Sequence, residues 1–272
     1  MTIAKAISGA NVPLYAILEV AGAIPANPVV NNVGFVNMSI EIGQPFEMSQ
    51  QNDGKRTTKQ PVKGQKKNQF SYETELTSAS CPFIFEVAMG TRTTEDLGGG
   101  LTLHHLDIEE NACNFVTASY EAVLTPCHAG ATAKLHRISG AIANTVNFQA
   151  QGGTGHFKAK VDGFYRHLTY PTTAMTDIAG AVVSDLVTPD AADNIYLEFS
   201  MFDGADVKID NTAREFPCFS VFGIEVSNNF TPIYGFGDHG DVTALVPGEA
   251  TCKVTGTWVP YNNDDLDILH NP

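Results

Sequence analysis

The chain has 272 residues, of which 43% are hydrophobic and 17% charged, and it contains 24 glycines and 14 prolines. This length suits one large β domain or two small ones. Short runs of β-branched and aromatic residues between many turn-forming residues favour an all-β fold with minor α content. No apolar run approaches the roughly 20 residues of a membrane-spanning helix, and the first residues lack the pattern of a secretory signal. We therefore expect a protein that is made in the cytoplasm and enters no membrane.

The charge is distributed unevenly along the sequence. The net charge is −14, yet six basic residues and no acidic residue lie between Gly54 and Asn68, which leaves a net charge of −20 for the rest of the chain. A basic segment attracts acidic surfaces, and an acidic body repels nucleic acid. We expect the segment to contact an acidic protein surface. One alternative is that it binds nucleic acid, although it has no aromatic residue for base stacking, and the other is that it is an ordinary loop without a partner. The six residues are Lys55, Arg56, Lys59, Lys63, Lys66 and Lys67.

The first third of the chain predicts an extended arm followed by a β-hairpin. Residues 1–32 form an arm or edge strand in this interpretation, with a short apolar piece at 14–18. Residues 35–42 alternate between polar and apolar side chains, and residues 70–76 do the same, with Phe70, Tyr72, Thr74 and Leu76 on the apolar face. The two strands would pair across the connection 43–69. A connection of that length is normally functional or disordered, and this one contains the basic residues.

A short helix is predicted over residues 82–89. Ser80 or Cys81 would cap it, Pro82 suits its first position, and Gly90 would end it. Because it is apolar on nearly all sides, we expect both its own sheet and a second subunit to cover it. The side chains expected to pack in this way are Phe83, Ile84, Phe85, Val87 and Met89.

The remaining elements suggest two units, a first β-sandwich over 1–172 and a second, smaller one over 173–272. Residues 169–194 are rich in Thr, Ala, Pro and Asp and look like a linker, and a weak helix would begin at Asn262 or Asn263. The order of elements in 219–272 repeats that of 35–90, with an acidic connection in place of the basic one, so an internal duplication is an open alternative. Further strands are expected at 101–106, 115–123, 145–149, 155–165, 195–202, 219–226 and 251–259.

No group of residues predicts catalysis, a metal site or a cofactor. His104 and His105 precede Asp107, but neighbouring strand residues face opposite sides and cannot easily share one ion. Ser139 lacks the G-x-S-x-G pattern of a hydrolase nucleophile. Trp258 alternates onto the face of Cys252, Val254 and Gly256, which we expect to be buried. Five cysteines without a C-x-x-C pair indicate free, buried thiols in a reducing compartment: Cys81, Cys113, Cys127, Cys218 and Cys252.

The order of these parts resembles the tail tube proteins of long-tailed bacteriophages, which share a β-sandwich or partial barrel, one packed helix and a long loop between two early strands. The likeness lies in the order of elements and covers about two thirds of the chain. The matching segments are strand 35–42, the loop to Gln69, strand 70–76 with the helix to Gly90, residues 138–148 with 155–165, and residues 219–226 with 247–258.

The resemblance implies a structural subunit of the virion tail, made in the host cytoplasm, and not an enzyme. Subunits would close into hexameric rings, or into trimeric pseudo-hexamers if the halves are duplicates. The rings would stack through the basic loop into a tube. The tape measure protein and the phage DNA would pass through the lumen without specific binding, and tail tip or baseplate and terminator proteins would bind the ends. The alternatives are a capsid decoration or baseplate-associated protein and a carbohydrate-binding β-sandwich.

Overall fold

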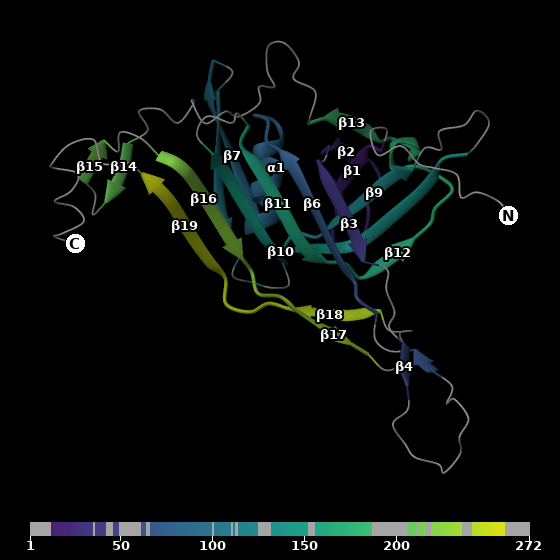
Figure 1. The fold of residues 1–272 in the computed structure, drawn as a ribbon. Coiled ribbons are helices and arrows are strands. Elements are labelled where there is room, and N and C mark those ends of the chain that lie inside the picture. Colours follow the sequence, from purple (N-terminus) through teal and green to yellow (C-terminus); the bar gives the residue numbers. More distant parts are fainter. Residues whose placement is uncertain are drawn as a thin grey trace.

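The computed structural model is mostly β-strand with a single α-helix among the residues that it describes (Figure 1). The all-β prediction with minor α content is confirmed. In the described part of the chain, no helix is long and apolar enough to cross a membrane. The described residues are 12–34, 36–41, 46–48, 61–63, 66–99, 101–109, 111, 114–124, 132–151, 156–186, 206–209, 212–215, 219–235 and 241–258.

Eleven strands form one continuous sheet in two parts that share the long strand β10 (Lys134–Gln151). One part, the β9 sheet, has the order β13 (Val182–Asp185), β2 (Val29–Asn32), β1 (Leu14–Leu18), β9 (Ala118–Leu124), β10 and β12 (His167–Thr169). The other part, the β6 sheet, has the order β3 (Asn37–Glu41), β6 (Gln69–Glu75), β11 (Lys158–Phe164), β10, β16 (Phe219–Ser227) and β19 (Thr251–Trp258).

Strand β10 passes from one part of the sheet to the other at a bulge. Its pairing with β9 shifts register between Ile138 and Ala141, and Gly140 has a φ of +60°, which a side chain would strain. The Glu19 carboxylate holds this bend, because it accepts hydrogen bonds from the Gly140 amide at 2.9 Å and from the Ser119 hydroxyl at 2.5 Å. The bend lets one strand join two sheets that face each other.

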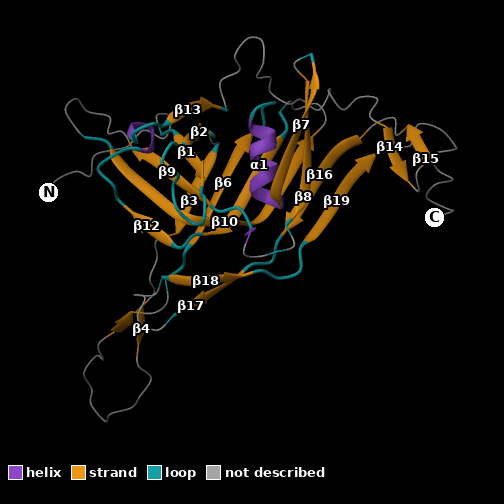
Figure 2. Cartoon of the chain, turned by 180° about the vertical axis from the view of Figure 1, so that it is seen from behind, coloured by secondary structure: helices purple, strands orange, loops and turns teal. Residues whose placement is uncertain are grey.

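The main core lies between the two parts of the sheet, with helix α1 (Ser80–Met89) packed into it (Figure 2). The rings of Phe85 on the helix and Phe148 on β10 stack with centroids 4.0 Å apart. Across the core, the hydroxyl groups of Tyr72 and Tyr120 lie 3.4 Å from each other. Burial raises the pKa of Tyr120 to about 12 and that of Tyr72 well above its ordinary value.

The predicted hairpin and helix are present, with one correction at the start of the helix. Strands β3 and β6 pair antiparallel, and helix α1 ends at Gly90 in the left-handed conformation, with a φ of +94°. The helix begins at Ser80, after Ala79, which has no capping side chain, and the Ser80 amide donates to the Thr77 hydroxyl at 3.0 Å. The Ser80 hydroxyl instead accepts a hydrogen bond from the amide of Thr77 at 2.8 Å, so Pro82 lies in the first turn and not at its first position.

The predicted linker at 169–194 is wrong for its first part, because residues 173–186 pack on the β9 sheet. Arg137 forms an ion pair with the fully buried Glu121 at 2.6 Å and also donates to the Thr173 carbonyl at 2.8 Å. The other Glu121 oxygen accepts from the amide of Met175, whose side chain is fully buried at the start of a 3₁₀ helix, Met175–Asp177. The buried charge pair therefore fixes the segment in place.

Several other expectations change with the pairing. Residues 14–18 form an interior strand between β2 and β9 and not an arm or an edge strand. Strands from both sides of residue 172 belong to the eleven-stranded sheet, so that boundary does not coincide with a break in it. The expected strand at 195–202 and the terminal helix lie outside the described residues. Four two-stranded pairs complete the part of the fold that the structure describes: β4 (Phe46–Met48) with β5 (Pro61–Lys63), β7 (Gly90–Gly98) with β8 (Leu101–Ile108), β14 (Asp206–Ile209) with β15 (Thr212–Glu215), and β17 (Thr231–Tyr234) with β18 (Val242–Val246).

Candidate functional site

The feature best suited to a function is the β6 sheet, which has one core face and one polar face. On β6, Phe70, Tyr72 and Thr74 are buried while the residues between them point away from the core. Cross-strand partners share a face, so Ser71 lies beside Ser39 on β3 and beside Asp162 on β11. The sheet therefore presents a broad, hydrophilic surface six strands wide.

This polar face has a negative balance of charge. The register places five carboxylates and three lysines on it. Lys160 lies 3.1 Å from Asp162, and Lys158 lies 3.5 Å from Glu73, so two of the lysines are already paired within the chain. The charged residues of the face are Glu41, Glu73, Glu75, Asp162, Glu225, Lys158, Lys160 and Lys253.

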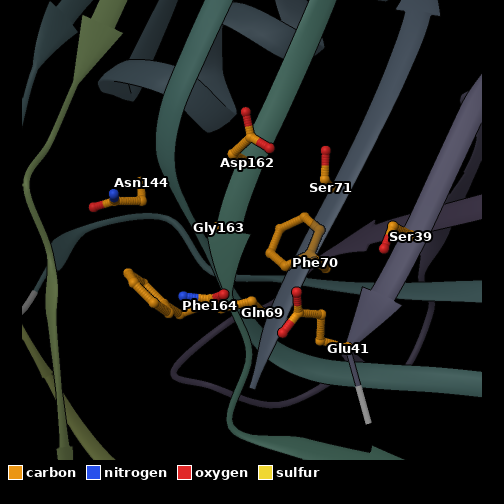
Figure 3. Close-up of a pocket in the computed structure, with 9 residues that line it drawn as sticks. All are labelled: Ser39, Glu41, Gln69, Phe70, Ser71, Asn144, Asp162, Gly163 and Phe164. Atoms are coloured by element: carbon orange, nitrogen blue, oxygen red, sulfur yellow. The ribbon is translucent and has the colours of Figure 1, made fainter. Parts of the chain in front are cut away.

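One hollow of about 230 Å³ opens on this face at the ends of β3, β6 and β11 (Figure 3). The side chains of Ser71 and Asp162 stand at its upper rim, and Glu41 lies below them (Figure 3). Its floor is closed by Phe70 and by Gly163, where a Cβ would collide with the Ile142 carbonyl. Its lining has two carboxylates, those of Glu41 and Asp162, and neither a histidine nor a lysine.

Both edges of the β6 sheet are open among the described strands. Each of its five strand pairs is antiparallel. With an even number of strands, the two edge strands β3 and β19 run in opposite directions. Unpaired strand edges are templates for pairing with another chain. Because β3 and β19 run in opposite directions, β19 of one copy has the direction needed to pair antiparallel with β3 of another copy.

The prediction of a buried face around Cys252 and Val254 is wrong. Val254 is 62% exposed, and Cys252 and Gly256 are exposed as well. They lie on the core side of β19, as the alternation predicted, because Cys252 pairs with the buried Val226. The difference arises because β19 is an edge strand, and no described element covers the core side there. The side chain of Trp258 lies outside the described residues.

The basic loop is described only at its base. There, Lys66 Nζ lies 2.6 Å from Asp241 Oδ1, which joins the basic connection 43–69 to the acidic connection between β16 and β19. Lys67 is exposed, and Lys63 lies in strand β5. Lys55, Arg56 and Lys59 lie outside the described residues. Of the six residues predicted to contact another ring, Lys66 therefore already has a partner within its own chain.

The helix residues are placed mainly in the chain's own core. Phe83, Ile84 and Val87 are buried, and Phe85 and Met89 are half-buried against the same cluster. The helix is thus covered largely by its own sheet, and of the five predicted residues only Phe85 and Met89 keep part of their surface exposed.

The other candidate residues do not gather into a site. His104 and His105 lie opposite Thr94 and Thr93, respectively, on strand β7, and His105 Nε2 is 3.5 Å from Glu95 Oε2. Among the residues that the structure describes, no three His, Cys, Asp or Glu side chains are placed to hold a metal ion. Cys81 and Cys252 are free thiols, and burial raises the pKa of Cys81 to about 11. Cys113, Cys127 and Cys218 lie outside the described residues.

The sequence matches no protein-family model, and no curated protein matches it. A functional assignment therefore depends on the sheet, its edges and its charges.

Proposed function

We propose that the chain is a structural subunit of a bacteriophage tail tube, which closes into rings that stack around a DNA-conducting lumen. The observation that carries the proposal is the six-stranded antiparallel β6 sheet with two open edges that run in opposite directions. Copies related by rotation about an axis roughly parallel to the strands would place β19 of one copy beside β3 of the next. Such a head-to-tail contact is heterologous and closes into a ring when the rotation permits.

The exposed side chains at the edges favour this arrangement. Val254 on β19 lies on the core side of the sheet, as do Met38 and Ile40 on β3. In a ring, Val254 would lie against the core side of the next subunit's β3 and lose its contact with water. The polar faces would form a continuous surface at the same time, and no sheet edge would remain free.

The polar face suits a passage for DNA. Five carboxylates and three lysines line it, and two of the lysines are held by carboxylates of the same face. A surface that offers few free cations makes few phosphate contacts and releases few counterions, so DNA gains little by binding to it. The proposal assigns the chain no enzymatic activity and no cofactor. Its partners are other copies of itself, the tail tip or baseplate and terminator proteins, and the tape measure protein and DNA in the lumen.

The decisive experiment is negative-stain electron microscopy of the purified full-length chain at increasing concentration, with light scattering to measure the mass in solution. We expect rings with a central hole and, at higher concentration, tubes made of stacked rings. A chain that stays monomeric at millimolar concentration would refute a tube role. Binding to a capsid surface without polymerisation would favour a decoration protein instead.

A further inference from the structure

The outer part of the β7–β8 hairpin is a second surface that the described part of the chain does not cover. Its strands pair only with each other in the described structure. Residues 93–99 are exposed, and so are Thr102, Leu103 and His105 on the returning strand. A two-stranded hairpin without a sheet or helix to cover it is marginally stable in water. A surface that covered the outer half of this hairpin would therefore stabilise it further.

The base of the hairpin is firmly attached to the body. Arg92 Nε lies 2.9 Å from Glu86 Oε2 on helix α1. The Thr91 hydroxyl donates to Glu109 at 3.0 Å, and the Glu109 amide donates to the Met89 carbonyl at 2.8 Å. These contacts fix the direction of the hairpin, so its exposed tip projects at a defined place from the molecule.

The tip combines apolar and acidic side chains. Leu97 is 57% exposed and Leu103 is 41% exposed. Glu95 lies directly opposite Leu103, and Asp96 follows it. Exposed leucines beside carboxylates are suited to a partner that presents long basic side chains, because lysine stems cover apolar surface while their ammonium groups reach the acids.

The two strands that flank the basic part of the connection, β4 and β5, lie at the opposite end of the molecule from the hairpin tip (Figure 1). Strands β4 and β5 extend from one end of the β6 sheet, and the tip of the β7–β8 hairpin projects from the other (Figures 1 and 2). Lys67 is exposed at the base of the β4–β5 extension, and 12 residues, three of them basic and one of them acidic, separate Met48 from Pro61. Stacking two copies along the strand direction would therefore bring the basic loop of one copy towards the acidic hairpin of the next.

We propose that the tip of the β7–β8 hairpin, formed by Glu95, Asp96, Leu97 and Leu103, is the surface that receives the basic loop of a second copy in the adjacent ring. This inference rests on the proposed function, because it assigns the receiving side of ring-to-ring contact. Ring closure through β3 and β19 uses a different surface, so the two contacts can be lost separately.

The test is a charge exchange in the full-length chain, followed by electron microscopy and sedimentation. Glu95→Lys with Asp96→Lys should leave single rings and abolish tubes, as should Lys55→Glu with Arg56→Glu and Lys59→Glu. Combining the five substitutions should restore tubes, because residues 49–60 then carry four acidic residues and no basic one and again meet a surface of opposite charge. Asp177→Lys changes an exposed carboxylate on the β9 sheet side and should leave tubes unchanged. Circular dichroism and thermal melting check that each variant is folded.

Each result has a distinct meaning. Normal tubes from the hairpin variant would overturn the inference while the tube proposal stands. If the combined exchange does not restore the lost tubes, the basic loop is not the segment that binds the hairpin. Absence of both rings and tubes from the unmodified chain would refute the proposed function itself. Because exposed charges are screened over about 10 Å at 0.1 M salt, we also expect the unmodified tubes to dissociate into rings as salt is raised.

Discussion

Replacing Val254 with lysine tests ring closure directly. The side chain is 62% exposed in the single chain, and it lies on the core side of edge strand β19. A lysine can extend into water there while the chain is alone, so the fold should tolerate it. In the proposed ring the same position is covered by the neighbouring β3. Charged residues that point inward on an edge strand are a natural means of preventing edge-to-edge pairing.

The size of the effect follows from the exposed area. Fully burying a valine side chain contributes about 1.5–3 kcal/mol, so covering the exposed 62% of Val254 contributes roughly 1–2 kcal/mol for each contact between copies. Burial of an unpaired ammonium group adds a penalty of several kcal/mol. Since about 1.4 kcal/mol corresponds to a factor of ten in affinity, we expect each contact to weaken by at least about a hundredfold.

The assay is light scattering over a concentration series, with electron microscopy of the same samples. Val20→Lys is the matched control, because Val20 is 67% exposed but lies in a turn outside the β6 sheet. We expect rings from the unmodified chain and from Val20→Lys, and monomers from Val254→Lys. Both variants should melt within a few degrees of the unmodified monomer. Rings formed by Val254→Lys at unchanged concentration would refute pairing through β19.

Three further outcomes are expected within one chain. Lys66→Glu should lower the free energy of unfolding by at most about 1 kcal/mol, because the ion pair with Asp241 is partly exposed, and adding Asp241→Lys should recover that loss in urea denaturation. Burial raises the pKa of Tyr120 to about 12, whereas the phenol in the unfolded chain ionises near pH 10. The contribution of this tyrosine to stability is therefore intact below pH 10 and should be lost as the pH rises from about 10 through 12. Tyr120→Phe should make the free energy of unfolding fall less steeply over this range in alkaline denaturation curves. Arg137→Met leaves the carboxylate of Glu121 buried without its cation, which should lower the free energy of unfolding by about 3–5 kcal/mol and expose residues 173–177 to limited proteolysis. If the variant resists proteolysis as well as the unmodified chain does, the ion pair does not fix this segment in place.

The hairpin and the helix could be predicted from the sequence because local signals decide them. Alternation on β6 identified Phe70, Tyr72 and Thr74 as buried, and Gly90 marked the end of the helix, as the structure confirms. Alternation of the same kind on β19 assigned Val254 to the correct face of the sheet, but it predicted a buried side chain where the structure has an exposed one. Alternation assigns a residue to a face, whereas burial depends on which other segment covers that face.

The packing of residues 173–186 could not be predicted because its cause is non-local. The segment has the composition of a linker, and it is held by Glu121 and Arg137 from strands β9 and β10. A glutamate and an arginine 16 residues apart in the sequence carry no sign that they will meet. Strand β7 was missed for a related reason, since its many polar residues reflect a hairpin exposed on both sides of its tip.

The number of strands in the β6 sheet also limits the width of any tube that it builds. Neighbouring strands lie about 4.8 Å apart, so six strands tilted by about 40° contribute roughly 38 Å to the circumference of a closed barrel. Three copies would then enclose a barrel about 36 Å across between backbones, and six copies one about 72 Å across. The bore of the tube grows in fixed steps of one subunit, so its diameter in a low-resolution image counts the copies in the ring.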